Sequence, residues 1–188
     1  MNVAGTSVNS FGACCAARAK AAYGFDPFEM VRVFGARVFA IAKHITQNDD
    51  DAGDVLIDAF LEVCADLDGS PDNEQAWLRL VNVAVRQAFL KLRARGEDPC
   101  EELLIRELFV WGDDYQPRDS GEGTTRTLER TLRSLDPMCR TVFVLKDIEG
   151  IAVEHIASIV NRSVAAVEVC LLRARLRLGE MLGQQAMH

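Results

Sequence analysis

The feature of the sequence that most limits its fold is the recurrence of apolar residues at three- and four-residue steps in two long blocks. In the first block, residues 28–95, this pattern runs through three segments separated by "TQNDDDAGD" and "DLDGSPDNE". The separators carry the acidic, Gly and Pro residues that begin and end helices. No stretch alternates apolar and polar residues as a half-buried strand would. The sequence therefore predicts an all-α protein.

The second block ends in two helical patterns of unequal length. Asp136-Pro137 begins a helix with Pro in its first turn. Residues 151–182 then hold a short and a long apolar pattern, broken by the polar triplet "NRS" at 161–163. A short helix, a tight turn and a longer helix predict a helix-turn-helix, whose second helix fits the DNA major groove. An ordinary helical hairpin is the alternative.

An acidic segment, residues 97–124, lies between the blocks. It holds nine Asp and Glu against two Lys and Arg, so its net charge of −7 equals that of the whole chain. Its Gly and Pro content is typical of a flexible linker. We therefore expect two small helical domains joined by an acidic flexible linker. The predicted divisions are an N-terminal tail at 1–25, a helical domain at 26–96, the linker at 97–124 and a helix-turn-helix domain at 125–188.

The cysteines and histidines show no spacing typical of a metal site. The six cysteines include no C-x-x-C pair, and we expect those in helical patterns to be packing residues. A thiol or metal sensor, or an enzyme that uses the cysteines, is a weaker alternative. No apolar run approaches the ~20 residues of a membrane helix, and the N-terminus lacks a signal-peptide pattern. We expect a cytoplasmic protein with no membrane insertion, no cofactor and no metal.

The second block resembles the fourth region of bacterial sigma factors of the sigma-70 family, in the extracytoplasmic-function (ECF) group. The resemblance rests on "SLDPMCRTVFVLKDIEG" and continues through "EHIA", "SVAAVE" and "LLRARLRL". In the first block, "DDAGDVLIDAFLEVCADL" resembles region 2 and "AWLRLVNVAVRQAFLKLRAR" resembles the promoter-melting helix. Together these segments cover about residues 28–182. The resemblance implies an alternative sigma factor that is not an enzyme. Its expected partners are core RNA polymerase, through the β′ and β subunits, promoter DNA and an anti-sigma factor.

The resemblance assigns core polymerase binding to the acidic helix of the first block. Such a helix docks on a coiled coil of the β′ subunit, and an acidic rim around an apolar stripe would set the register of docking. A solvated acidic face around an ordinary core helix is the alternative. The expected polymerase-binding residues are Asp51, Asp54, Val55, Asp58, Phe60 and Glu62.

DNA binding is expected from two further sets of residues, because cations bind phosphates and donors early in a recognition helix reach base edges. The aromatic residues of the first of these helices, Trp77 and Phe89, have core spacing and are expected to pack. A solvated helix end is the alternative for Arg175 and Arg177. The expected DNA-binding residues are Arg79, Arg86, Lys91, Arg93 and Arg95 in the first block, and Arg162, Ser163, Glu168, Arg173, Arg175 and Arg177 in the second.

The sequence departs from the family pattern at two of these places. An arginine-asparagine pair usual in the melting helix is Val83-Ala84 here. A lysine, a small polar residue and an arginine usual in the recognition helix are Glu168, Val169 and Cys170. We expect weaker or altered promoter recognition. A second hypothesis is therefore a sigma-like protein with degenerate promoter contacts that acts as an anti-sigma decoy.

Overall fold

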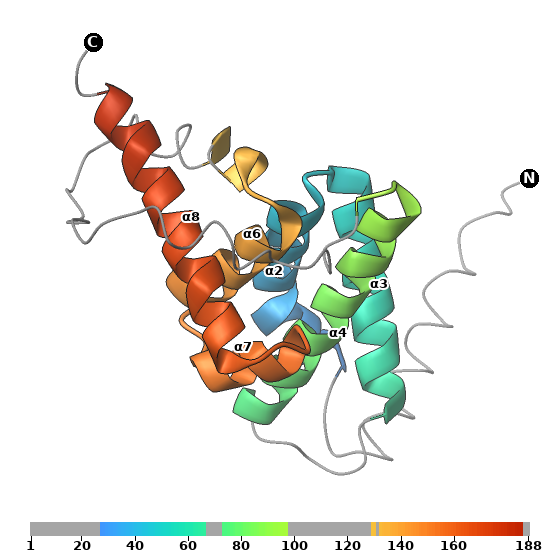
Figure 1. The fold of residues 1–188 in the computed structure, drawn as a ribbon. Coiled ribbons are helices and arrows are strands. Elements are labelled where there is room, and N and C mark those ends of the chain that lie inside the picture. Colours follow the sequence, from blue (N-terminus) through green and yellow to red (C-terminus); the bar gives the residue numbers. More distant parts are fainter. Residues whose placement is uncertain (1–26, 67–72, 98–128, 131, 186–188) are drawn as a thin grey trace, which may run out of the picture.

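The fold is described from a computed structural model of the chain, which places residues 27–66, 73–97, 129–130 and 132–185. These residues form helices and turns, with no strand among them (Figure 1). The predicted N-terminal tail and all of the predicted linker except Glu97 lie outside the described residues. The prediction of an all-α protein is confirmed.

Three helices form the first half of the molecule, α2 (Pro27–Thr46), α3 (Asp49–Asp66) and α4 (Asn73–Ala94). All three contact one another, and their apolar residues meet in a common core. The buried positions follow the three- and four-residue steps of the sequence. They are Met30, Phe34, Val38, Ile41, Ala42, Ile45, Ala52, Val55, Ala59, Phe60, Val63, Ala76, Trp77, Leu80, Val81, Ala84, Val85, Ala88, Phe89 and Leu92.

The second half contains a helical segment at 129–130 and 132–134, then α6 (Pro137–Phe143), the π-helix η2 (Val144–Ile148), α7 (Val153–Ile159) and α8 (Val164–Gln185). The start of α6 is fixed by Asp136, whose side chain accepts a hydrogen bond from the Cys139 N–H at 2.9 Å. Pro137 fits in the first turn, where its missing N–H costs nothing. Both features follow the prediction from the sequence.

The π-helix η2 was not predicted. Its wide turn is closed by a hydrogen bond from the Glu149 N–H to the Val144 carbonyl, five residues earlier, at 3.0 Å. Gly150, at a φ of 73°, then ends the helical path. The wide turn carries Asp147 and Glu149, and each of them forms an ion pair with a residue of another helix. The π-turn thus lies where α8 of this half and α2 of the first half both contact it.

The arrangement of α7 and α8 is that of a helix-turn-helix. Their axes bend by 103°, within the range of about 90–120° for this motif. Asn161 in the turn has a φ of 53°, a conformation that asparagine tolerates better than most residues. The Ser163 hydroxyl then caps α8 by accepting from the Ala166 N–H at 3.2 Å. Among the described helices, none alone has the length and composition to cross a membrane. Only α7 and α8 taken together, across their bend, reach that length and composition.

The two halves pack against each other. α6 and η2 contact α2, α7 contacts α4, and the buried apolar residues of both halves form one cluster (Figure 1). At this junction Arg140, only 4% exposed, donates to the Ile45 carbonyl at the end of α2 at 2.7 Å. The Arg37 guanidinium of α2 also pairs with the Glu149 carboxylate at 2.7 Å. The division into separate domains at 26–96 and 125–188 stays a prediction.

Candidate polymerase and nucleic-acid interfaces

The acidic start of α3 is held by a side-chain cap. The Asn48 carbonyl oxygen Oδ1 accepts from the Asp51 N–H at 3.0 Å, and Asp49, Asp50 and Asp51 lie in the first turn. Negative charge at this position is favoured by the helix dipole. The three aspartates of the first turn therefore stabilise α3, independently of any partner that they bind.

The predicted polymerase-binding residues divide into two groups in the structure. Asp54 and Asp58 are exposed, and Asp51 and Glu62 are partly exposed. Val55 and Phe60 are instead buried in the core of the first half. Their spacing in the apolar stripe is that of core residues, so the structure gives these two a packing role, and their polymerase-binding role stays a prediction.

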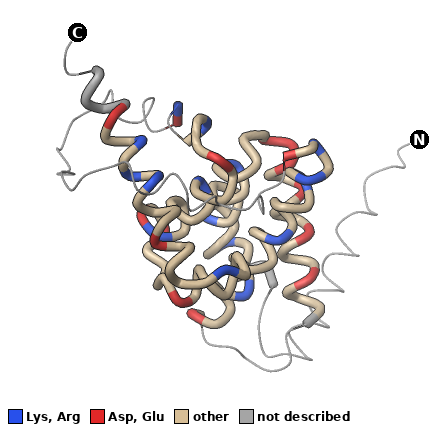
Figure 2. The backbone as a smooth tube through the Cα atoms, viewed as in Figure 1, with Lys and Arg blue, Asp and Glu red and all other residues tan. Residues whose placement is uncertain are grey.

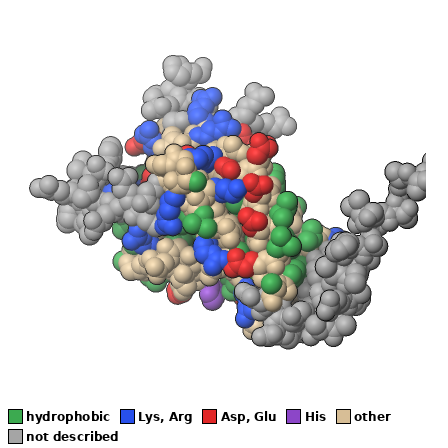
Figure 3. All heavy atoms as spheres, turned by 90° about the vertical axis from the view of Figure 1, so that its right-hand side faces the viewer, with side chains coloured by type: hydrophobic (Ala, Val, Ile, Leu, Met, Phe, Trp, Pro, Cys, Tyr) green, Lys and Arg blue, Asp and Glu red, His purple; other side chains and the backbone are tan. Residues whose placement is uncertain are grey.

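Two exposed apolar residues of α3 were missed by the sequence analysis. Ile57 is 59% exposed and Leu61 is 66% exposed, one helical turn apart. In Figure 3, hydrophobic side chains gather beside a column of acidic ones on this side of the molecule. Their spacing in the sequence could have identified them as exposed, because both fall outside the buried stripe of Val55, Ala59 and Val63. An exposed apolar pair beside carboxylates has the composition of a protein-docking surface.

The acidic side of α3 faces the basic side of α4. The carboxylates of Asp54 and Asp51 pair with Lys91 at 2.6 Å and with Arg95 at 2.9 Å. Glu62 pairs with Arg86 and also accepts from Gln87 at 3.3 Å. The hydrogen bond with Asp54 raises the pKa of the Lys91 ammonium. Figure 2 shows acidic segments along α3, and Figure 3 shows acidic and basic side chains next to one another on this side of the molecule. We call the three pairs, Asp51–Arg95, Asp54–Lys91 and Glu62–Arg86, the α3–α4 charge ladder.

Of the cations predicted to bind DNA in the first half, three belong to the charge ladder. Arg95 has a further structural role, since it also donates to the Thr46 carbonyl at 2.6 Å. Arg79 and Arg93 are exposed on α4, and Arg79 makes no ion pair with any residue that the structure describes. The structure thus does not gather the five cations into one open patch.

The aromatic residues of α4 pack, as expected. Trp77 stacks on Phe34 with ring centroids 5.5 Å apart, and the Arg37 guanidinium lies 3.9 Å from its ring centroid. Arg37 is the same residue that pairs with Glu149, so the indole is part of the contact between the halves. Phe89 is buried in the core.

The Val83-Ala84 pair, where the family pattern has arginine and asparagine, lies at the edge of the core. Ala84 is fully buried, and Val83 is partly buried against the core. Val83 lines a hollow of about 240 Å³ together with Val63, Arg79 and Asn82. Within this hollow, Arg79 and Asn82 are the side chains with hydrogen-bonding groups.

In the recognition helix, the residues of the turn and first turns are those predicted to meet DNA. Arg162, Ser163 and Glu168 are exposed, and Arg173 is partly exposed. Cys170, where the family pattern has arginine, is buried, and Val169 is partly buried. Glu168 therefore adds a negative charge to an outer face that also presents Arg162 and Arg173.

The last two predicted DNA contacts hold ion pairs within the second half. Arg175 makes a two-pronged contact with Asp147 of η2, at 2.9 and 2.6 Å. Arg177 pairs with Glu180 on the same helix at 3.1 Å. Arg175 thus fixes α8 to the π-turn, a role that sequence spacing did not reveal.

The described cysteines pack inside the protein. Cys139 and Cys170 are buried where α6 meets α8, and a side-chain hydrogen bond between them, with burial, raises the pKa of the Cys139 thiol. Cys64 is partly buried, and burial raises its pKa. Among the residues that the structure describes, no three His, Cys, Asp or Glu side chains gather as metal ligands would. Cys14, Cys15 and Cys100 lie outside the described residues.

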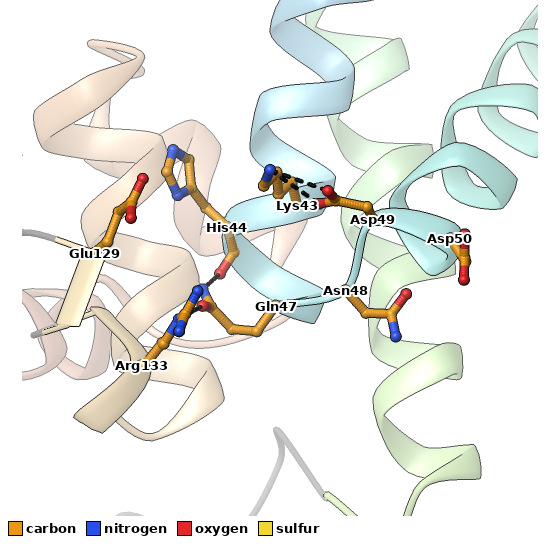
Figure 4. Close-up of a pocket in the computed structure, with 8 residues that line it drawn as sticks. All are labelled: Lys43, His44, Gln47, Asn48, Asp49, Asp50, Glu129 and Arg133. Atoms are coloured by element: carbon orange, nitrogen blue, oxygen red, sulfur yellow. Dashed lines mark hydrogen bonds and ion pairs between the residues drawn. The ribbon is translucent and has the colours of Figure 1, made fainter. Parts of the chain in front are cut away.

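A hollow of about 450 Å³ marks the junction between the halves (Figure 4). It lies where the end of α2 and the start of α3 meet the segment 129–134. Lys43 pairs with Asp49 across it at 2.9 Å, and Arg133 donates to Gln47 at 3.2 Å. Its lining is polar and charged, namely Lys43, His44, Gln47, Asn48, Asp49, Asp50, Glu129 and Arg133.

Comparison with known proteins agrees with this geometry. Residues 125–178 match the family described as "Sigma-70, region 4". This range includes α7, the turn and α8 as far as Leu178. The ECF RNA polymerase sigma factor SigE of Mycolicibacterium smegmatis is 29% identical over 164 residues, 84% of this chain. Over residues 125–178 the chain is thus similar to region 4 of the sigma-70 family, and over most of its length it is similar to an ECF sigma factor. It spans 62% of the length of that SigE relative.

Two solved structures share the fold of this chain. One is the sigma factor RpoE in complex with the anti-sigma factor NepR from Bartonella quintana. It has a TM-score of 0.62 and 21% identity, over 82% of this chain and 94% of that one. The other is CnrH in complex with the cytosolic domain of CnrY, with a TM-score of 0.55 and 23% identity, over 91% and 96% of the two chains. These likenesses confirm the predicted helical architecture.

Proposed function

We propose that this protein is an alternative sigma factor that binds core RNA polymerase and directs transcription initiation at promoters. The observation that carries the proposal is the region 4 match, which falls on a helix-turn-helix with an exposed recognition-helix start. A sigma factor acts by binding and not by catalysis, and it acts in the cytoplasm, where RNA polymerase works.

Core polymerase docks, in this proposal, on the exposed face of α3. Ile57 and Leu61 supply an apolar contact, while Asp54 and Asp58 supply a negative rim. Such a surface fits a basic partner helix, because apolar area gives affinity and complementary charge gives register and a high association rate. The likeness in fold to RpoE, which was solved with the anti-sigma factor NepR, supports a further partner of that class.

Purified full-length protein and core polymerase test the docking face directly. We expect the double variant I57N/L61N to bind core at least about tenfold more weakly, because it removes two exposed apolar contacts without disturbing the core. The matched control is V31N/V33N, which alters two exposed apolar residues of α2. Equal loss in both variants, or none in either, would contradict docking through α3.

Promoter-dependent transcription by the reconstituted enzyme tests the second part of the proposal. Initiation at promoters selected by crosslinking and sequencing is expected. Core binding without initiation at any promoter would favour the decoy hypothesis, and no core binding at low salt would oppose both.

A further inference from the structure

The α3–α4 charge ladder joins residues that the proposed function gives to two different partners. Asp51, Asp54 and Glu62 belong to the polymerase-docking helix, and Arg86, Lys91 and Arg95 belong to the helix expected to bind nucleic acid. Both sets cannot keep their present contacts while also serving those partners. In the free protein, three carboxylates of one proposed surface are paired with three cations of the other.

The pairs differ in how easily they can open. In the Asp54–Lys91 pair, the side chains are 60% and 32% exposed, and in the Glu62–Arg86 pair they are 33% and 53% exposed. Ion pairs exposed to this degree contribute only about 0.2–1 kcal/mol, so a charged partner can replace them at low cost. Arg95 is different, because its second hydrogen bond to the Thr46 carbonyl ties it to the end of α2.

We propose that the α3 carboxylates screen Lys91 and Arg86 in the free protein, and that a basic polymerase helix docking on α3 releases these two cations to bind nucleic-acid phosphates. The inference rests on the proposed function and adds its regulation. Docking and nucleic-acid binding are coupled through shared side chains, with Asp54 and Glu62 as the screening groups.

The physical reason is competition for the same charges. A phosphate that approaches Lys91 or Arg86 must displace a carboxylate already in contact and is repelled by it. A cationic partner that takes over Asp54 and Glu62 removes that repulsion and leaves the cations unpaired. Because linkage is reciprocal, nucleic acid bound to these cations strengthens polymerase docking by the same factor.

The first experiment measures binding of full-length free protein to fluorescein-labelled single-stranded DNA across a salt series. The variant D54N/E62Q should bind about fivefold more tightly at low salt, because two cations are released. Its log–log salt dependence should steepen by about 1.4, or roughly 0.7 for each new phosphate contact on a single strand. The matched control D50N/E74Q makes the same change in charge at two exposed carboxylates that form no ion pair within the part of the chain that the structure describes.

A mutant cycle then tests whether the gain comes from the named cations. R86Q/K91Q alone should change the affinity of the free protein by less than about twofold, because those cations are already screened. In the D54N/E62Q background, the same pair of substitutions should abolish the fivefold gain. R79Q, which removes a cation outside the ladder, should weaken binding equally in both backgrounds. Equal effects of R86Q/K91Q in both backgrounds, or equal gains in D54N/E62Q and D50N/E74Q, would overturn the screening.

The coupling between docking and nucleic-acid binding is measured with the variant R86Q/K91Q bound to core polymerase. R86Q/K91Q should weaken nucleic-acid binding by the core-bound protein at least about fivefold, while leaving the free protein nearly unchanged. An equal, small effect in both states would overturn the release step. Failure of the wild type to bind core would instead count against the proposed function, since the free-protein cycle reports on screening without polymerase.

Discussion

Arg140 is a buried cation whose three hydrogen bonds all go to carbonyl groups near helix ends. Its guanidinium donates to Ile45 at 2.7 Å and to Leu132 and Leu135 at 3.4 Å each. Carbonyls at a helix C-terminus lack partners within the helix and carry the negative end of the dipole, so a cation there is stabilised. Burial lowers the pKa of this arginine, yet a guanidinium keeps its proton at neutral pH. The residue therefore joins the two halves through charge and not through apolar contact alone.

Replacing Arg140 tests this role. We expect R140M to lower the free energy of unfolding by about 3 kcal/mol, because it leaves several buried carbonyls without a donor. Urea denaturation followed by circular dichroism measures the change. R130M, at an exposed arginine of the preceding segment, should cost less than about 0.5 kcal/mol, and similar losses in the two variants would contradict the argument.

His44 gives the junction a dependence on pH. Burial lowers its pKa, while Glu129 and Glu149 act in the opposite direction and Lys43 acts in the same direction. The unfolded chain, in which His titrates near 6.5, therefore binds a proton more readily than the folded protein does. The free energy of unfolding should thus fall as the pH drops below about 6.5 and level off once the folded imidazole is also protonated.

The variant H44Q should lose less of its free energy of unfolding than the wild type between pH 7.5 and pH 5.5. Urea midpoints at the two pH values measure this difference. H155Q, at an exposed histidine of α7, is expected to follow the wild type. If H44Q and the wild type lose the same amount, His44 is not the titrating group.

At the scale of the element, α8 combines a recognition-helix position with an unusual outer face. Its exposed start bears Glu168 where the family pattern has lysine, and the neighbouring Cys170 turns into the core. A carboxylate repels the phosphate backbone, although it can accept a hydrogen bond from a cytosine amino group. The element is thus folded for the major groove but weakly charged for it.

The substitution E168K should raise the affinity for duplex DNA about fivefold at low salt and steepen the salt dependence by roughly 0.9. Fluorescence anisotropy over a range of NaCl concentrations gives both values. E154K, on the first helix of the motif, makes the same charge change at another exposed site. An increase of the same size in E154K would show that only the net charge of the protein matters.

At the scale of the whole molecule, the two halves are joined by contacts distant in sequence. Arg37 lies between the Trp77 ring and the Glu149 carboxylate, and that carboxylate side chain is only 9% exposed. A carboxylate so poorly hydrated depends on its partner. The pair therefore contributes more than an ordinary surface ion pair does.

A double-mutant cycle measures this contribution. R37A and E149A should each lower the free energy of unfolding, and the double variant should cost about 1–2 kcal/mol less than the sum of the two. Thermal and urea unfolding of the four proteins give the coupling energy. Additivity within about 0.3 kcal/mol would show that the pair does not hold the halves together.

The helices could be predicted because each buries one stripe of residues. Phe34, Val38 and Ile41 in α2 show the periodicity directly, and Asp136-Pro137 marks the start of α6. The π-turn could not be predicted, since widening one turn leaves the apolar pattern of Val142, Val144 and Leu145 nearly unchanged. The helix-turn-helix was predicted from a short and a long helical pattern separated by a polar triplet, and a resemblance suggested its family.

The functional surfaces could be predicted only in part. Opposite charges on α3 and α4 were visible, but a single sequence does not give the register in which Asp54 meets Lys91 or Glu62 meets Arg86. Residues such as Arg37 and Glu149, 112 positions apart, carry no local sign that they meet. Ile57 and Leu61 could have been noticed, because apolar residues outside a helix's buried stripe must face either solvent or another protein.

The end of α2 is held from two sides, by Arg140 at Ile45 and by Arg95 at Thr46. If the halves part, the Ile45 carbonyl and the Arg140 guanidinium must both be rehydrated, because each loses its partner. The hydrogen bond from Arg95 to the Thr46 carbonyl remains, since both residues belong to the first half. This buried, charged contact therefore adds to the energy barrier for separation, together with the Arg37–Glu149 pair and the shared apolar cluster. The molecule should switch between two discrete shapes and not drift through a continuum of partly open ones.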